Sequence, residues 1–146
     1  MCFGGGTPNV LSKEQMTRIM TGIHSNFNVM PTAEFSMEMN PGIHSQSKLQ
    51  FFKDVGVNRV SVGAQSFDQK VLDDYGRNHS VEDTVSFVHQ VADVGFENVS
   101  VDIIFGHSNH STENVITSLQ YVGDLKVPHV ALYGLTILEG TPFHQM

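Results

Sequence analysis

Two patterns of apolar residues alternate along the chain, one typical of helices and the other of short strands. The clearest helical pattern covers residues 12–27, in which Ser12 is a suitable N-cap and Gln15 stands at the capping-box position. We therefore predict an amphipathic helix here. Its buried face is predicted to contain Met16, Ile19, Met20, Ile23 and Phe27.

Later helices have weaker but recognisable boundaries. Segments 46–55 and 68–75 are predicted to be short helices, and a longer one follows between Ser80 as cap and Gly95 as terminator. Thr112 is predicted to cap the last helix. The stripes predicted to be buried are Val81, Val85, Val88 and Val91 in the longer helix, and Ile116, Leu119 and Val122 in the last one.

Short apolar runs between these helices are predicted to be strands. They cover residues 1–3, 35–39, 59–64, 99–105 and 130–135. Strands that alternate with helices are typical of an α/β protein, in which right-handed crossovers join parallel strands. Residues 139–146 are turn-like in composition.

The length limits how much of a barrel this sequence contains. A chain of 146 residues is enough for one domain with one core, and we expect a single domain over residues 1–146. A complete eight-stranded barrel needs roughly 250 residues, so a barrel here is a partial one. Because a barrel strand at Met1 needs a neighbour on each side, we expect further residues upstream.

Composition excludes several classes of protein. The net charge of −7 argues against a nucleic-acid-binding surface, which is normally basic. No apolar run approaches the roughly 20 residues of a membrane-spanning helix, and no secretory signal opens the sequence. The single cysteine, Cys2, excludes an internal disulfide, fits a reducing compartment, and is predicted to pack as a small hydrophobe.

Polar or glycine-rich motifs stand where the predicted strands end. They are FGGGTP at 3–8, EMNPG at 38–42, VGAQSF at 62–67 and DIIFG at 102–106. In βα barrels, ligands bind at the face formed by such strand ends. The three glycines allow the backbone to approach a ligand and to present N–H groups to an anion or carboxylate. A tight turn into a helix is the equally good alternative.

Glu38 lies between two methionines near the end of a strand, so its side chain points away from Met37 and Met39. In a barrel that direction is inward, where a carboxylate needs a cation or a donor such as a ligand amino group. The alternative is an exposed acid on an edge strand. Gln65 and Asp102 raise the same question at the ends of the next two strands.

Other polar residues are weaker candidates. Arg77 follows Gly76 in a loop; it is either solvated or paired with a carboxylate of the same pocket. His107 and His110 form an HxxH pattern, but without a nearby carboxylate or cysteine a metal site is not favoured. The remaining histidines are predicted to be ordinary polar positions. No P-loop, Rossmann or nucleophile-elbow motif is present.

Six segments together resemble a known family. FGGGTPNVLS, EMNPG, RVSVGAQSFD, LDDYGRNHS, VDIIFG and LTILEGTPF resemble the core of radical S-adenosylmethionine (SAM) proteins, in particular the oxygen-independent coproporphyrinogen III oxidase group. Within that group the QSF, GRNHS and LTILEGTPF segments are most similar to the heme-chaperone branch. The resemblance implies a partial (β/α)6 TIM-like barrel of parallel strands, here without its first strand and cluster loop.

The resemblance also implies site residues. Gly5, Gly6 and Thr7 would hold the methionine part of SAM. Glu38 would pair with a cationic group of the ligand. Asp102 would accept from a ribose hydroxyl. The complete set of implied SAM-contacting positions is Gly5, Gly6, Thr7, Glu38, Gln65, Arg77, Asp102 and Thr136.

Cofactors and partners follow from the same resemblance. The family uses SAM and a 4Fe–4S cluster held by a CxxxCxxC motif, which would precede Met1; one cysteine cannot replace three thiolate ligands. The parent protein would bind heme and transfer it to acceptor proteins, in mitochondria or the cytoplasm. Two alternatives remain: an enzyme that oxidises a porphyrin precursor, and a short protein that binds a ligand without catalysis.

Overall fold

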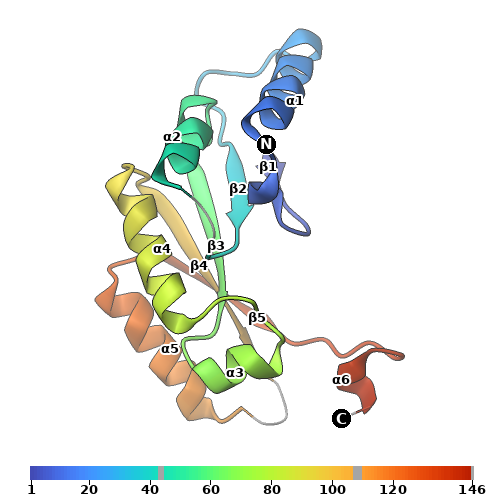
Figure 1. Ribbon diagram of the computed structural model, residues 1–146, viewed down its shortest axis with the longest axis vertical. Coiled ribbons are helices and arrows are strands. Elements are labelled where there is room, and N and C mark those ends of the chain that lie inside the picture. Colours follow the sequence, from blue (N-terminus) through green and yellow to red (C-terminus); the bar gives the residue numbers. More distant parts are fainter. Residues whose placement is uncertain (43–44, 107–109, 146) are drawn as a thin grey trace.

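The computed structural model describes residues 1–42, 45–106 and 110–145 and shows five parallel strands joined by helices (Figure 1). Strand order along the sheet follows the sequence, β1-β2-β3-β4-β5. The α/β class and the parallel sheet that the sequence predicts are therefore confirmed. The strands are β1 (Cys2–Phe3), β2 (Ser36–Met39), β3 (Arg59–Gln65), β4 (Asn98–Phe105) and β5 (His129–Gly134).

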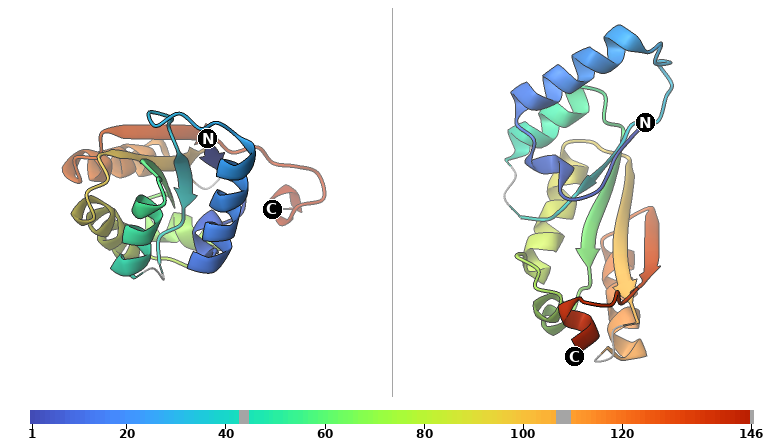
Figure 2. Two further views of the ribbon diagram at one scale, coloured as in Figure 1. Left: turned by 90° about the horizontal axis from the view of Figure 1, so that it is seen from above. Right: turned by 90° about the vertical axis from the view of Figure 1, so that its right-hand side faces the viewer.

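Apart from the last short helix, the helices follow the outside of the curved sheet (Figure 2). A 3-10 turn, η1 (Pro8–Val10), precedes the first of them. The α-helices are α1 (Lys13–Asn26), α2 (Gln46–Asp54), α3 (Gln69–Asp74), α4 (Val81–Asp93), α5 (Thr112–Asp124) and α6 (Pro142–Gln145). None of the helices in the described part of the chain is both long and apolar enough to cross a membrane.

One face of the sheet forms the core with the helices. Alternate strand residues are buried on that side, namely Met37, Met39, Val60, Val62, Val99, Val101 and Ile103. From α1, Met16 and Met20 complete this core. Because side chains alternate along each strand, the remaining ones point to the opposite face, which we call the inner face and which carries many polar side chains. Strand register brings four of these into one row: Glu38, Ser61, Ser100 and His129.

The N-terminal caps of two helices bear on the predictions. Ser12 caps α1 and forms the predicted box with Gln15. The cap of α5 is Ser111 and not Thr112 as predicted, because the Asn114 side chain reaches back to Ser111, whose hydroxyl accepts from the Asn114 backbone. Residues 142–145, predicted to be turn-like, form the short helix α6.

Some residues predicted to be buried are exposed. Ile19 and Phe27 are 37% and 68% exposed, and Phe27 is the C-cap residue that follows α1. Ile116 on α5 is also exposed, at 40%. Cys2 does not pack as a small hydrophobe: it is exposed at the start of the edge strand β1, and it lines a cavity on the inner face.

The core makes a direct stability test possible with two methionines. Replacing the fully buried Met37 by alanine is expected to lower the free energy of unfolding by about 2–5 kcal/mol, because it removes buried methylene groups and leaves a cavity. Met30, which is 66% exposed, is the matched control and should change it by less than about 0.5 kcal/mol. Urea unfolding measures both, and equal effects would contradict the assigned core.

Candidate functional site

The ends of β1, β2, β3 and β4 and the loop after α3 surround a cavity of about 140 Å³. Predicted site residues that are far apart in the sequence meet in this cavity, and most of them come from strand ends, as expected. Its lining contains Gly6, Glu38, Gln65, Arg77 and Asp102, together with Pro8, Met39, Asn40 and Gly63. A larger cavity of about 610 Å³ adjoins it through Asn40 and Arg77.

The glycine turn after β1 is tied to Glu38 on β2. The backbone N–H of Gly5 donates to Glu38 Oε2 at 2.8 Å. A Cβ atom on Gly4 would lie 2.7 Å from Glu38 Oε1, so a larger residue there would force the carboxylate to shift from its position against the turn. Gly5 and Gly6 have φ values of +79° and +60°, which also favour glycine. The Gly5 N–H is therefore directed at a protein carboxylate, and the other oxygen, Oε1, remains next to Gly4.

Two asparagines that the sequence analysis passed over fix the rest of the turn. Asn40 donates through Nδ2 to Thr7 Oγ1 at 3.1 Å, and buried Asn9 donates to the Asn40 backbone oxygen at 3.1 Å. The sequence carries a signal for Asn40, because a polar side chain next to the Pro41-Gly42 turn needs partners once it is partly buried.

Gln65 reaches the cavity through an unusual backbone. Its φ is +68°, and the register between β3 and β4 shifts between Val62 and Gln65. A Cβ atom on Gly63 would lie 2.9 Å from Gln65 Nε2, so the glycine leaves room for that amide. A positive φ at a residue other than glycine costs about 1–3 kcal/mol, so neighbouring contacts must impose it.

Helix α5 supplies those neighbouring contacts. The Phe67 backbone N–H donates to Ser118 Oγ at 2.9 Å, and the Ser66 and Ser118 hydroxyls are 3.5 Å apart. All three side chains are buried. The ring of Phe67 also stacks on Tyr121 with centroids 5.0 Å apart. These contacts hold the segment that follows Gln65.

Asp102 lies half-buried on β4 beside Ser61 of β3. Ser61 Oγ is 2.8 Å from each carboxylate oxygen of Asp102 and donates its proton to them. Burial raises the pKa of Asp102, and the nearby Glu38 charge raises it further, whereas the Ser61 hydrogen bond opposes both. The cavity thus holds two carboxylates whose charges are only partly compensated by protein groups.

The cationic side of the site is formed by Arg77. Burial lowers the pKa of its guanidinium, and its backbone N–H is fixed by Leu72 O at 3.0 Å. Arg77 lines both cavities, and the larger one also contains Thr7, Lys48 and His79 but none of the acids. Burial lowers the pKa of Lys48 and of His79 as well. The arrangement separates an acidic compartment from a basic one, with Arg77 between them.

Two predicted features are not brought into this site. Thr136 is exposed beyond β5, and none of the described contacts joins it to the cavity lining. Of the HxxH pattern, His107 lies outside the described residues, and His110 packs edge-on against Tyr75 with ring centroids 5.2 Å apart. Within the ranges that the structure describes, no three histidine, cysteine or acidic residues are grouped as a metal site.

Comparison with known proteins identifies one family and several relatives. The profile of the Radical SAM superfamily matches residues 1–140. Heme chaperone HemW of Lactococcus lactis is 36% identical over 141 residues, which are 97% of this chain and 37% of that protein. "Radical S-adenosyl methionine domain-containing protein 1, mitochondrial" of Danio rerio is 34% identical over 142 residues, 95% of this chain and 31% of that protein. The chain therefore spans about a third of the length of these relatives.

A solved structure supports the barrel. Coproporphyrinogen III oxidase (HemN) from Escherichia coli, described as a radical SAM enzyme, superimposes with a TM-score of 0.86 at 28% identity. The match covers 94% of this chain and 32% of that one. The five-stranded sheet with its helices is thus part of a radical SAM barrel, as the sequence resemblance implied.

The raised pKa of Asp102 predicts how stability varies with pH. Because the folded-state pKa exceeds the unfolded value of about 3.9, the native state binds more protons, and stability falls as pH rises from that value through the folded pKa. Asp102→Asn removes this loss, so we expect a higher melting temperature than wild type at about pH 7. At about pH 3 the Asp102 carboxyl is mostly protonated in both the folded and the unfolded state. The difference in melting temperature between Asp102→Asn and wild type should therefore disappear.

The exposed Asp93 on α4 provides the control substitution, Asp93→Asn. Melting curves of the three proteins across this pH range measure the effect. A destabilised Asp102→Asn variant at neutral pH would show that the carboxylate charge is compensated within the fold, contrary to the assignment.

Proposed function

This chain belongs to the Radical SAM superfamily, and we propose that it binds S-adenosylmethionine in the cavity lined by Glu38, Gln65, Arg77 and Asp102. The observation that carries the proposal is the convergence of these four side chains, from three strands and one loop, on a single cavity. Gly5, Gly6 and Thr7 form its turn, and Thr136 completes the proposed set from the segment after β5.

The charges of the cavity suit this ligand. SAM carries a positive amino group and a positive sulfonium, and Glu38 and Asp102 are acids whose charges lack full compensation. Its methionyl carboxylate needs a donor, and Arg77 presents a guanidinium to both cavities. Asp102 retains acceptor capacity for a ribose hydroxyl beside its bond from Ser61. The donor and acceptor types in the cavity therefore fit the ligand.

The residues of this chain do not fit the family's iron–sulfur cluster. A 4Fe–4S cluster in this family is held by three cysteine thiolates, and the 146 residues contain one cysteine. We derive no radical step through a cluster for these residues. Radical chemistry is proposed only for a parent protein that supplies the cysteine motif.

For that parent protein we propose heme handling: binding of heme and its transfer to acceptor proteins. The support is the similarity to heme chaperone HemW, at 36% identity over nearly the whole chain. The zebrafish relative is named as mitochondrial, and we propose a mitochondrial or cytoplasmic location here.

Oxidation of a porphyrin precursor is the second candidate. It is favoured by the superposition on coproporphyrinogen III oxidase with a TM-score of 0.86. Anaerobic incubation of the intact protein with reductant, SAM and coproporphyrinogen III separates the two functions. Consumption of the porphyrinogen would favour the oxidase, whereas heme binding without consumption would favour the chaperone.

The proposed SAM site is tested with Glu38. Replacing it by glutamine removes the charge that would meet the ligand amino group, and we expect SAM binding to weaken by about 1–3 kcal/mol, the value for a charged hydrogen bond. Isothermal titration of SAM into the intact protein measures the change. Glu82→Gln, on the exposed surface of α4, is the matched control.

An unchanged SAM affinity in Glu38→Gln would contradict the assignment. Because Glu38 also accepts from Gly5, thermal unfolding of the same samples is needed. A variant that binds weakly but melts like wild type supports a ligand contact, whereas parallel losses would point to a role in the turn.

A further inference from the structure

The larger of the two cavities at the candidate site, which we call the basic compartment, carries more positive charge than SAM needs. It measures about 610 Å³ and adjoins the acidic cavity at Asn40 and Arg77. Small-molecule pockets commonly measure roughly 300–1,000 Å³, so the basic compartment can hold a ligand of its own. In the part of the chain that the structure describes, its lining includes Arg77 and Lys48 but no acidic residue. The charge of this compartment therefore suits an anionic group.

Lys48 supplies a positive charge that the protein does not balance. It is the third residue of α2, its side chain is partly buried, and its ammonium lies 5.8 Å from the ring centroid of Phe52. No carboxylate among the described residues forms an ion pair with it. Burial lowers the pKa of Lys48, as expected for a charge that has lost water without gaining a counter-ion. A ligand carboxylate in the compartment would supply that counter-ion.

The other basic residues of the compartment are already accounted for. Arg77 is matched to the methionyl carboxylate of SAM in the function proposed above. His79 Nε2 lies 3.3 Å from Ala64 O, which can only accept, so this nitrogen carries the proton. Burial lowers the pKa of His79, and its ring is mostly neutral at about pH 7. Lys48 is therefore the cation that remains for a second ligand.

The basic compartment also has apolar walls. Val10 and Pro41 line it, and Val10 is 67% exposed although its side chain is apolar. Ligand pockets typically combine apolar walls with a few polar groups that orient the ligand. The lining thus suits a ligand with an apolar body and a carboxylate. A tetrapyrrole, the ligand class of both functions proposed above, has an apolar ring system with carboxylate side chains.

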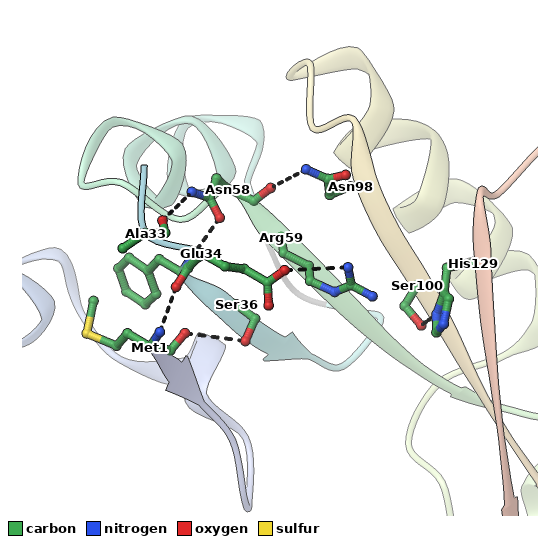
Figure 3. Close-up of polar contacts among 10 residues, drawn as sticks. Met1, Ala33, Glu34, Ser36, Asn58, Arg59, Asn98, Ser100 and His129 are labelled. Carbon is green, nitrogen blue, oxygen red and sulfur yellow. Dashed lines mark hydrogen bonds and ion pairs between the residues drawn. The ribbon is translucent and has the colours of Figure 1, made fainter. Parts of the chain in front are cut away.

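The inner face of the sheet is less suitable for a carboxylate. Its cavity of about 210 Å³ is lined by the same two acids as the SAM cavity, and their charge repels an anion. Arg59, which also lines it, forms an ion pair with Glu34 at 3.6 Å (Figure 3). His129 Nδ1 lies 2.8 Å from Ser100 Oγ in the same view. The basic compartment is therefore the better site for an anionic ligand group.

We propose that the basic compartment binds a carboxylate side chain of a tetrapyrrole, with Lys48 as its charged partner. The inference rests on the proposed function, because it names the part of this chain that recognises the ligand of the parent protein. Since the compartment shares Arg77 with the SAM cavity, the carboxylate end of the tetrapyrrole lies beside SAM. The carboxylate replaces water at the Lys48 ammonium, and no covalent bond forms or breaks.

Titration of hemin into the intact protein, followed by absorption spectroscopy, tests the proposal. Lys48→Gln is expected to bind hemin about tenfold more weakly than wild type, because it loses one charged hydrogen bond. Lys48→Arg keeps the charge and should restore most of the affinity. Lys70→Gln, on the exposed surface of α3, is the matched control and should behave as wild type. Hemin dimethyl ester, whose carboxylates are blocked, should bind equally to wild type and Lys48→Gln.

Titration of SAM into the same variants shows whether the compartment belongs to a second ligand. Because the SAM carboxylate is assigned to Arg77, Lys48→Gln should keep the SAM affinity of wild type, which also verifies that the site is folded. Equal losses of SAM and hemin affinity, in a variant with an unchanged circular dichroism spectrum, would assign the compartment to SAM and overturn the inference.

The remaining outcomes separate this inference from the proposed function. If the wild type binds no hemin, the heme function itself fails, and the inference fails with it. If the wild type binds hemin and Lys48→Gln binds it equally tightly, only the inference is overturned. Should Lys48→Gln fail to fold, Lys48→Met, which keeps an unbranched side chain next to Phe52, gives the same decision.

Discussion

The register of the five parallel strands is the constraint on which the rest of the structure depends. Side chains alternate between the two faces, so one register decides at once which residues enter the core and which line the inner face. Met37 and Met39 are buried in the core, whereas Glu38 between them points to the inner face. The same register places Ser61 and Ser100 beside Glu38 and His129. The arrangement of the candidate SAM site therefore follows from strand pairing.

Electrostatic imbalance is the second property of the site. Glu38 and Asp102 lie near each other, and burial of Asp102 disfavours its charged form. The glycine turn satisfies one oxygen of Glu38, and Ser61 satisfies Asp102 only through a single proton. A cationic ligand would relieve this imbalance, whereas the free protein tolerates it at some cost in stability. Catalytic and binding sites commonly carry such a cost.

Much of the fold was predictable because it depends on local pattern. Alternation of apolar runs and caps gave the strand and helix order, and Ser12 with Gln15 fixed the start of α1. The direction of Glu38 followed from its two methionine neighbours. Convergence of Glu38, Gln65 and Asp102 followed from the rule that strand ends meet at one face, although only family resemblance suggested a ligand.

The remaining features depend on contacts that no local pattern contains. The exposure of Phe27 could not be predicted, because helical spacing alone does not show whether another element packs over the end of α1. The roles of Asn9 and Asn40 required knowledge of their partners across two loops. Likewise, nothing around His129 in the sequence indicates Ser100, which is 29 residues away.

The bond between Phe67 and Ser118 also has a consequence for motion. The Phe67 amide is protected by a hydroxyl on α5 and not by a neighbouring strand. Its hydrogen therefore exchanges with solvent only when the helix separates from the sheet, in an opening of the kind that native-state exchange detects. Gln65, with its positive φ, lies two residues earlier, so exchange of the Phe67 amide hydrogen would report on the segment that carries one side of the candidate site.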